Sequence, residues 1–228
     1  MRVSANYCLS KPALRTNNNK QPIRKDVNFT GWGKNIKAPC LLVCDIVGTL
    51  DFGRNWREIV KNGIDLAKKR NAYVVYATGG FNYNDADFPQ PDFLISRFQD
   101  GLGLTTFGTE RSTREQLNLD NKADVVEILR ERLNIPWHEV IMAGDDLSDK
   151  GMAKLAEQER AYFVAPENLS PHFADPLRQL AKKAPEHIIV AEEDGAEGVF
   201  NGLQRIIEAR TEAEKNRSFW GCLIRLFR

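Results

Sequence analysis

The sequence has no long apolar run: it never reaches the roughly 18 consecutive apolar residues that a membrane-spanning helix requires. The apolar stretch of a secretory signal is also missing near the start, and the four cysteines include no CxxC pair. Aromatic residues make up only 9% of the 228 residues. We therefore expect a cytoplasmic protein with one main domain and free thiols in a reducing compartment, not an integral membrane protein.

The chain also lacks a large net charge: 32 Lys and Arg residues balance 31 Asp and Glu residues, which leaves a formal net charge of +1. The balance is uneven along the chain. Residues 1–38 hold eight basic residues and one acidic, whereas the rest holds 24 basic and 30 acidic. A net negative main domain favours a cytosolic enzyme over a nucleic-acid-binding protein, so no nucleic-acid partner is expected. We interpret residues 1–38 as a basic, largely irregular extension of a domain at 39–214.

Short apolar, β-branched runs alternate with amphipathic stretches from residue 40 onward. We expect strands at residues 40–46, 72–77, 92–96, 140–143, 161–164 and 187–191, and helices at 56–70, 121–133, 150–159, 170–183 and 198–214. Alternation of this kind implies crossover connections between parallel strands. The predicted fold class is α/β: a Rossmann-like three-layer sandwich with a mostly parallel central sheet.

Polar residues follow three of the predicted strands, at the edge of the sheet where ligands bind in such folds. The first strand leads into DIVGTLD (residues 45–51), the second into TGG (78–80), and a later one into GDDLSD (144–149). Lys122 begins the helix that lies between the last two of these in sequence. Taken alone, each feature is typical of a helix cap or a turn. Together they predict a site where several carboxylates meet a lysine.

The ordered set of motifs resembles the haloacid dehalogenase-like (HAD) phosphohydrolase superfamily from about residue 41 to residue 207. The family's first motif, DxDGT, corresponds to DIVGT, and its last, GDxxxD, corresponds to GDDLSD. Thr78 and Lys122 are similar to the second and third motifs. The later EDG (193–195) is similar to the end of the Cof-like and sugar-phosphatase branch. The resemblance implies a HAD-type fold and phosphatase activity on a phosphorylated small molecule or a phosphoprotein.

The carboxylates of this set are hard oxygen ligands suited to Mg²⁺, which tolerates two carboxylates together with water and phosphate oxygens. We expect Asp45, Asp145 and Asp149 to hold the metal. The resemblance adds the main-chain carbonyl of Val47 as a further ligand.

The remaining residues of the set are suited to a phosphoryl group. Lys122 would place a positive charge on its oxygens, and Thr78 with the backbone N–H groups of Gly79 and Gly80 would donate hydrogen bonds to them. The resemblance assigns Asp45 as the nucleophile that forms an aspartyl-phosphate, which water then hydrolyses.

One position departs from the family pattern, because Val47 stands where the family has an aspartate that protonates the leaving oxygen and then activates water. General acid–base assistance contributes about 10²–10⁴-fold, or about 3–5 kcal/mol. The readings are a phosphatase for acyl or anhydride phosphates, cleavage of another bond, or a pseudoenzyme that binds Mg²⁺ and a phosphorylated ligand or a protein partner. A further interpretation is that another carboxyl group replaces the missing acid–base residue, with Asp51, Asp85 and Asp87 as candidates.

No predicted segment is long enough for a cap domain, so a capless or minimally capped enzyme is expected. An open site excludes water poorly, so a macromolecular substrate or another subunit of an oligomer would close it. Aromatic residues in the 79–121 segment are candidates for a substrate platform, an oligomer surface or core packing: Phe81, Tyr83, Phe88 and Phe93.

The carboxyl end, residues 215–228, has four basic and no acidic residues, and its aromatic and aliphatic residues recur at nearly helical spacing. Two interpretations stay open for this tail and for the basic extension. Each docks on the domain's own surface, or each attaches the protein to a partner or peripherally to a membrane, with Cys222 as an acylation candidate.

Overall fold

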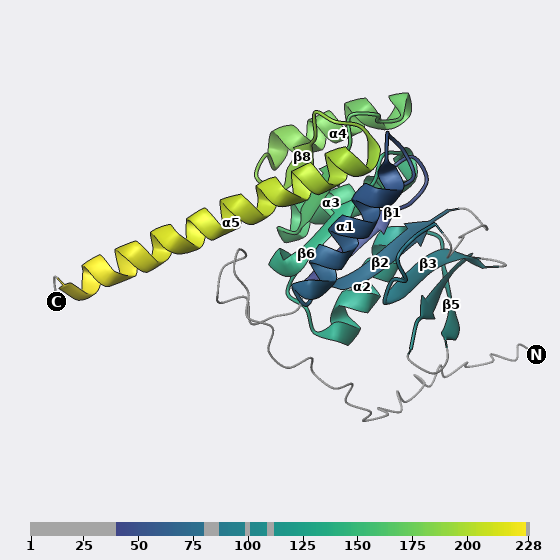
Figure 1. Cartoon of the computed structure of the whole chain (residues 1–228), viewed down its shortest axis with the longest axis horizontal. Coiled ribbons are helices and arrows are strands. Elements are labelled where there is room, and N and C mark those ends of the chain that lie inside the picture. Colours follow the sequence, from purple (N-terminus) through teal and green to yellow (C-terminus); the bar gives the residue numbers. More distant parts are fainter. Residues whose placement is uncertain (1–39, 80–86, 99–100, 109–111, 227–228) are drawn as a thin grey trace, which may run out of the picture.

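The computed structural model describes residues 40–79, 87–98, 101–108 and 112–226, with side chains described as far as residue 213 (Figure 1). Within that part of the chain, no helix combines the length and apolar character needed to cross a bilayer. The predicted extension at 1–38, and with it Cys8, lies outside the described residues.

The six predicted strands and five predicted helices are all present, and their bounds differ from the expected ones by a few residues at most, apart from the last helix. The strands are β1 (Leu41–Asp45), β2 (Tyr73–Thr78), β3 (Phe93–Phe98), β4 (Gly101–Thr106), β5 (Thr113–Leu119), β6 (Val140–Ala143), β7 (Tyr162–Ala165) and β8 (Ile188–Val190). The helices are α1 (Trp56–Lys69), α2 (Lys122–Leu133), α3 (Lys150–Glu159), α4 (Pro171–Lys183) and α5 (Gly195–Leu226), with 3-10 turns η1 (Trp137–Glu139) and η2 (Leu147–Asp149).

One sheet contains all eight strands in the order β5-β4-β3-β2-β1-β6-β7-β8. In this order, all neighbouring pairs between β3 and β8 are parallel. At one edge, β4 is antiparallel to both of its neighbours, β3 and β5. Every residue of β1 is buried, because this central strand is covered on both faces. The predicted α/β class with a mostly parallel central sheet is confirmed.

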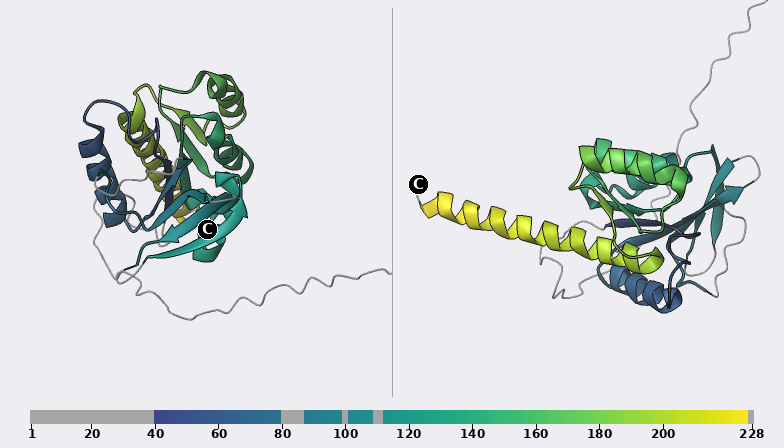
Figure 2. Two further views of the ribbon diagram at one scale, coloured as in Figure 1. Left: turned by 90° about the vertical axis from the view of Figure 1, so that its right-hand side faces the viewer. Right: turned by 90° about the horizontal axis from the view of Figure 1, so that it is seen from above.

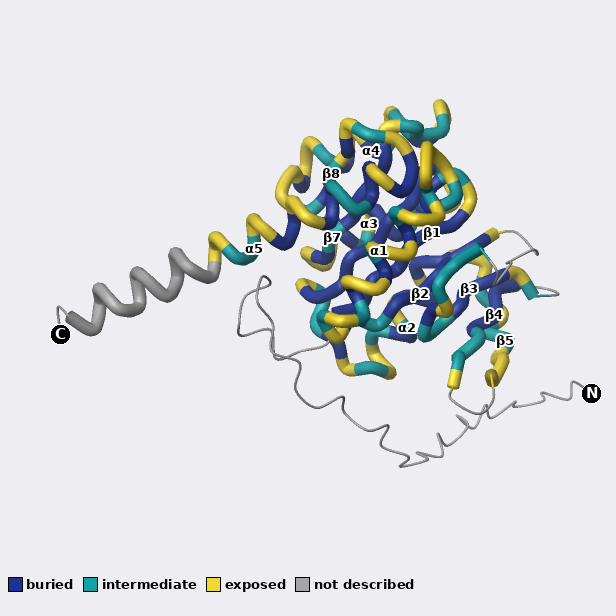
Figure 3. The backbone as a smooth tube through the Cα atoms, viewed as in Figure 1, coloured by how far each residue is buried: buried dark blue, intermediate teal, exposed yellow. Residues whose placement is uncertain are grey.

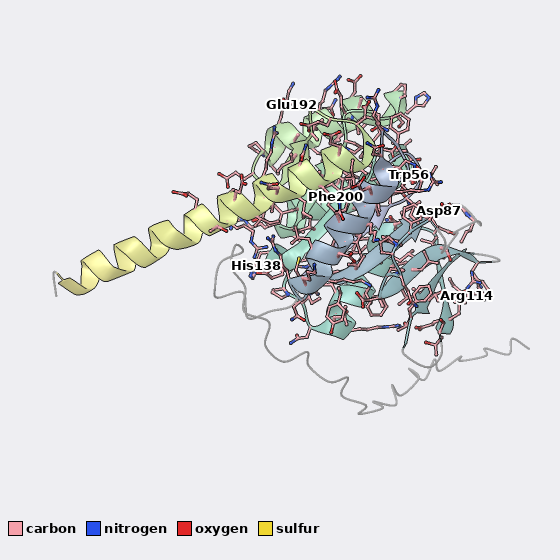
Figure 4. The ribbon with its side chains drawn as sticks, in the orientation of Figure 1. Trp56, Asp87, Arg114, His138, Glu192 and Phe200 are labelled. Carbon is pink, nitrogen blue, oxygen red and sulfur yellow. The ribbon has the colours of Figure 1, made fainter. Side chains whose placement is uncertain are left out.

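Helices cover both faces of the sheet, which gives the three predicted layers (Figure 2). Leu41 and Val43 of β1 belong to the core beneath α2, α3 and α4. Leu42 and Cys44 alternate to the opposite face and belong to the core beneath α1 and α5. On that second face Phe200 projects from α5 toward α1 (Figure 4), and its ring occupies the space that a Cβ at Gly63 would need.

The pair β4 and β5 was not predicted from the sequence. The strand β5 is mostly exposed and polar, and lacks the apolar alternation of a half-buried strand. Its Glu115 accepts hydrogen bonds of 2.6 and 2.9 Å from the Arg132 guanidinium of α2. Charged side chains on a short outer strand are typical of a protected sheet edge. The two strands extend the sheet and do not cover its carboxyl edge as a cap.

The last helix is longer than predicted at both ends. It starts at Gly195, three residues earlier, and its backbone stays helical to Leu226, across the expected boundary between residues 214 and 215. Val199, Leu203 and Ile206 pack on the sheet, while the residues after 207 are exposed or half-buried up to 213 (Figure 3). The side chains of the predicted amphipathic tail, including Cys222, lie outside the described residues.

The aromatic residues of the 79–121 segment that the structure describes pack into the domain. Phe88 lies against Trp56 and Tyr76, with ring centroids 5.0 and 5.6 Å away, and Phe93 lies 6.2 Å from Tyr73. Core packing is therefore their role, and Phe81 and Tyr83 lie outside the described residues.

Candidate active site

The predicted site residues gather at the carboxyl edge of the central strands. Asp45 is the last residue of β1 and pairs in register with Ala77 of β2, so Thr78 lies one residue beyond it. On the other side of β1, Cys44 pairs with Ala143, the last residue of β6. Because β1 and β6 are parallel neighbours, the motifs that follow them emerge side by side.

Three carboxylates meet at this edge. Ligand oxygens of Asp45, Asp145 and Asp149 all lie within 4.8 Å of one another, and all three side chains are buried. Carboxylates that repel each other away from water are unfavourable unless a cation compensates them. The geometry therefore forms a candidate metal centre of hard oxygen donors, the set that divalent ions such as Mg²⁺ prefer.

Lys122 supplies one compensating charge. Its Nζ donates to Asp45 Oδ1 at 2.5 Å and to Asp149 Oδ1 at 2.8 Å, and only 5% of the side chain is exposed. Local structure fixes this position, because Lys122 is the first residue of α2 and the Asn121 side chain caps the helix by accepting from the N–H of Ala123 at 3.0 Å. The lysine is thus held at a helix start that faces the strand ends.

Burial raises the pKa of all three carboxyl groups. Desolvation and the charge of Asp149 raise the pKa of Asp45 to about 8, despite the opposing effect of Lys122. Desolvation also raises the pKa of Asp145 to about 6, although a hydrogen bond from Thr49 lowers it, and it raises the pKa of Asp149. Burial also disfavours the charged form of Lys122. The negative charges of Asp149 and Asp45 outweigh this effect and raise the pKa of Lys122 to about 12. One ammonium does not compensate three carboxylates, so the cluster favours a cation.

The loop after β6 is built around Asp149. Its Oδ2 accepts from the backbone N–H groups of Asp145 and Asp146, at 3.2 and 3.3 Å. Asp146 caps η2 by accepting from the N–H of Ser148 at 2.7 Å. The Asp149 side chain occupies the space that a Cβ at Gly144 would need, so the glycine lets this loop close. The GDDLSD spacing therefore shapes the loop as well as placing two candidate ligands.

The loop after β1 is equally constrained. Gly48 has a φ of 79°, and a Cβ there would lie 2.5 Å from Asp145 Oδ2, so both conformation and space require glycine. The Gly48 N–H donates to Asp51 Oδ1 at 2.7 Å. Thr49 is completely buried and donates to Asp145 Oδ1 at 2.6 Å. Val47, in contrast, is 60% exposed.

Sequence reasoning missed Asn168, which follows β7 on the same edge of the sheet. Its Nδ2 donates to the carbonyl of Gly48 at 2.8 Å, and its Oδ1 accepts from the N–H of Gly195 at 2.7 Å. The side chain thus links the β1 loop to the start of α5. Inspecting the residues after β7 as well as those after β1, β2 and β6 would have singled it out. Thr49 belongs to the predicted DIVGTLD motif, but only its contact with Asp145 shows its role.

The predicted phosphate-binding residues are only partly described. Thr78 is buried at the end of β2, and Gly79 is exposed, with open space where a Cβ would lie. Gly80 lies outside the described residues. Val47, expected to offer its carbonyl to the metal, stands in the turn that follows β1.

The structure places the candidate substitutes for the missing acid as follows. Asp51 accepts from the Gly48 N–H within its own turn. Asp87 forms an ion pair of 2.9 Å with Arg57, next to Trp56 at the start of α1 (Figure 4). Asp85 lies outside the described residues.

Known structures share this architecture. A haloacid dehalogenase-like hydrolase, yhjK of Bacillus subtilis, has a TM-score of 0.55 at 14% identity, covering 75% of this chain and 90% of that protein. The sucrose-phosphatase of Synechocystis sp. PCC6803, solved with sucrose and phosphate, has a TM-score of 0.54 at 12% identity, covering 74% and 98%. No protein-family model and no curated protein matches the sequence. At these identities the likeness concerns the fold, and the chain has the HAD-type fold that its motifs predicted.

Proposed function

We propose that this protein is a Mg²⁺-dependent phosphohydrolase that works through an aspartyl-phosphate on Asp45. The single observation that carries the proposal is the convergence at one sheet edge: ligand oxygens of Asp45, Asp145 and Asp149 lie within 4.8 Å of one another. Lys122 joins them through contacts of 2.5 and 2.8 Å. The structural neighbours in the HAD-type fold include hydrolases and a phosphatase, which supports the reaction class.

The donor set fits a divalent cation, because three buried carboxylates exceed the charge of Lys122. Asp45, Asp145 and Asp149 would hold it, together with the carbonyl of Val47. When bound, Mg²⁺ supplies positive charge that offsets the repulsion between an anionic nucleophile and a phosphate dianion.

The chain's own groups then perform the transfer. A carboxylate oxygen of Asp45 attacks phosphorus, and the bond to the leaving oxygen breaks. Lys122 holds the Asp45 carboxylate in place and adds positive charge to the transferring group. Thr78, with the N–H groups of Gly79 and Gly80, donates hydrogen bonds to the phosphoryl oxygens. Water afterwards attacks phosphorus of the aspartyl-phosphate, which releases inorganic phosphate and restores the Asp45 carboxylate.

The exposed Val47 supports a second candidate, a pseudoenzyme that binds Mg²⁺ and a phosphorylated ligand or a protein partner with little turnover. Its side chain stands at the family's acid–base position and exchanges no proton. General acid–base help is worth about 10²–10⁴-fold, so its loss alone reduces a phosphatase to a slow enzyme without removing the nucleophile or metal ligands.

Turnover that depends on both Mg²⁺ and Asp45 separates the two candidates. The purified chain is assayed with p-nitrophenyl phosphate and acetyl phosphate, with Mg²⁺ or with EDTA, beside the Asp45→Asn variant. We expect hydrolysis in the presence of Mg²⁺ only and a loss of at least about 10³-fold in Asp45→Asn, since no other carboxylate replaces the nucleophile.

Asp65→Asn is the matched control, because Asp65 is exposed on α1 and its loss should change nothing. Phosphate binding with no Asp45-dependent release of product would favour the pseudoenzyme. Equal activity in Asp45→Asn and the parent would refute the proposed nucleophile.

A further inference from the structure

Large apolar side chains are exposed around the candidate site. Among the described side chains, five large hydrophobic residues are exposed, and three of them lie on the segments that follow β1 and β6: Val47, Phe52 and Leu147. Val47 is 60% exposed and Leu147 is 50% exposed. Exposed apolar residues scattered singly need no explanation, but these three lie on two adjoining segments of the candidate site, where an apolar part of a substrate would cover them.

These segments adjoin the reacting groups. Val47 lies two residues after Asp45, and Leu147 lies two residues after Asp145. The two loops contact each other, because Thr49 of the first donates a 2.6 Å hydrogen bond to Asp145 of the second. A substrate that reaches Asp45 therefore meets the two loops that carry these exposed apolar side chains, which we call the apolar rim (Val47, Phe52 and Leu147).

Three described carboxyl groups on or near these segments each have one partner already. Asp51 accepts from the Gly48 N–H at 2.7 Å, and Asp146 accepts from the Ser148 N–H at 2.7 Å. Asp87 is paired with Arg57. At the family's acid position stands Val47, whose side chain exchanges no proton.

We infer that the site hydrolyses aryl phosphates, whose leaving group departs without a proton and whose ring contacts Val47 and Leu147. The inference rests on the proposed function and adds its substrate class. As an Asp45 oxygen bonds to phosphorus, the phosphorus–oxygen bond to the ring breaks and its electron pair stays on the aryloxide. The aryloxide takes a proton from solvent, and water later hydrolyses the aspartyl-phosphate.

The first test measures kcat/KM across phenyl phosphates with leaving phenols of graded acidity, because kcat/KM reports the step in which the phenol departs. Hexyl phosphate adds an apolar but weakly acidic leaving group, and acetyl phosphate adds an acidic but small one. In the parent protein we expect kcat/KM to increase steeply with the acidity of the leaving phenol. In Val47→Asp, hexyl phosphate should gain about 10²-fold or more, with a much smaller gain for p-nitrophenyl phosphate.

The second test concerns the rim. Leu147→Ser should raise KM about tenfold for phenyl phosphates and leave acetyl phosphate unchanged, because only the aryl group contacts this side chain. Leu66→Ser is the matched control, since Leu66 is 46% exposed on α1, outside both loops. Thermal unfolding of each variant verifies that the fold is intact, as all these positions are exposed. A tyrosine-phosphate peptide compared with phenyl phosphate decides whether the aryl group is free or part of a protein.

If kcat/KM of the parent protein did not depend on phenol acidity, the inference would be overturned, because another group would then protonate the leaving oxygen. Asp85 would be the first residue to substitute in a search for that group. Equal KM values for phenyl phosphates in Leu147→Ser and the parent would overturn the apolar contact. Both results leave the proposed function standing, because turnover still depends on Asp45. Absence of Asp45-dependent turnover on every substrate would instead refute the proposed function, and the substrate class with it.

Discussion

Thr49 and Asp145 are joined by a 2.6 Å hydrogen bond between residues 96 positions apart in sequence. The hydroxyl is completely buried and connects the loop after β1 to the loop after β6. It thereby orients a candidate metal ligand and lowers the pKa of that carboxyl against the larger effect of desolvation.

Replacing Thr49 with Val keeps the shape of the side chain and removes this hydrogen bond. Partners that orient a metal ligand are worth about 10–100-fold in affinity, so we expect Mg²⁺ to bind about tenfold more weakly. Isothermal titration calorimetry measures the affinity directly. Thr113→Val on the exposed edge strand β5 is the control, and equal affinity in both variants would contradict a role for Thr49 in the metal site.

Replacing Lys122 with Met leaves three buried carboxylates without their ammonium. Removing one partner of a buried charge pair costs about 3–5 kcal/mol, so we expect the free energy of unfolding in EDTA to fall by that amount and Mg²⁺ to restore part of it. Urea denaturation followed by circular dichroism gives both values. Lys154→Met, at an exposed position of α3, should leave the free energy of unfolding almost unchanged. An equally small change in Lys122→Met would refute the idea that Lys122 compensates the buried carboxylates.

Stability without metal should fall as the pH rises from about 4 to 8. Burial raises the pKa of Asp45 to about 8 from the usual 3.8, so across this interval the folded state binds more protons than the unfolded state. The free energy of unfolding then decreases by up to about 1.4 kcal/mol per pH unit. Denaturation at several pH values in EDTA measures the slope, which should be shallower in Asp45→Asn. A rising stability over this interval contradicts the prediction.

The aspartyl-phosphate should accumulate during turnover, because Val47 cannot activate the water that hydrolyses it. Rapid mixing with p-nitrophenyl phosphate should give a burst of nitrophenol close to one per protein, and hydroxylamine should trap the intermediate. Val47→Asp should hydrolyse it about 10²-fold faster and so remove the burst. Linear product release from the first turnover onward in the parent would show that hydrolysis of the intermediate is not limiting.

The sequence predicted the central part of the fold well because its signal is local. Buried parallel strands such as β1 and β6 form continuous apolar runs, and amphipathic helices repeat every 3.6 residues, so both are visible without knowledge of their neighbours. The outer strands β4 and β5 were missed for the opposite reason. Most of their residues are polar or Gly, with Leu at only four positions. Gly103 lies where a Cβ would come 3.2 Å from the carbonyl of Glu115, a constraint that exists only once the strands pair.

By itself, the sequence determined the order of the central strands and the helices and the identity of the charged residues that follow those strands, because apolar periodicity and strand-end chemistry are properties of neighbouring residues. Only the tertiary structure decided the individual contacts through which these residues meet. The contacts of Lys122 with Asp45 and Asp149, the bond from Thr49 to Asp145, and the bridge made by Asn168 all join distant segments. Such contacts depend on parallel strands in register, which bring separate loops to a common edge.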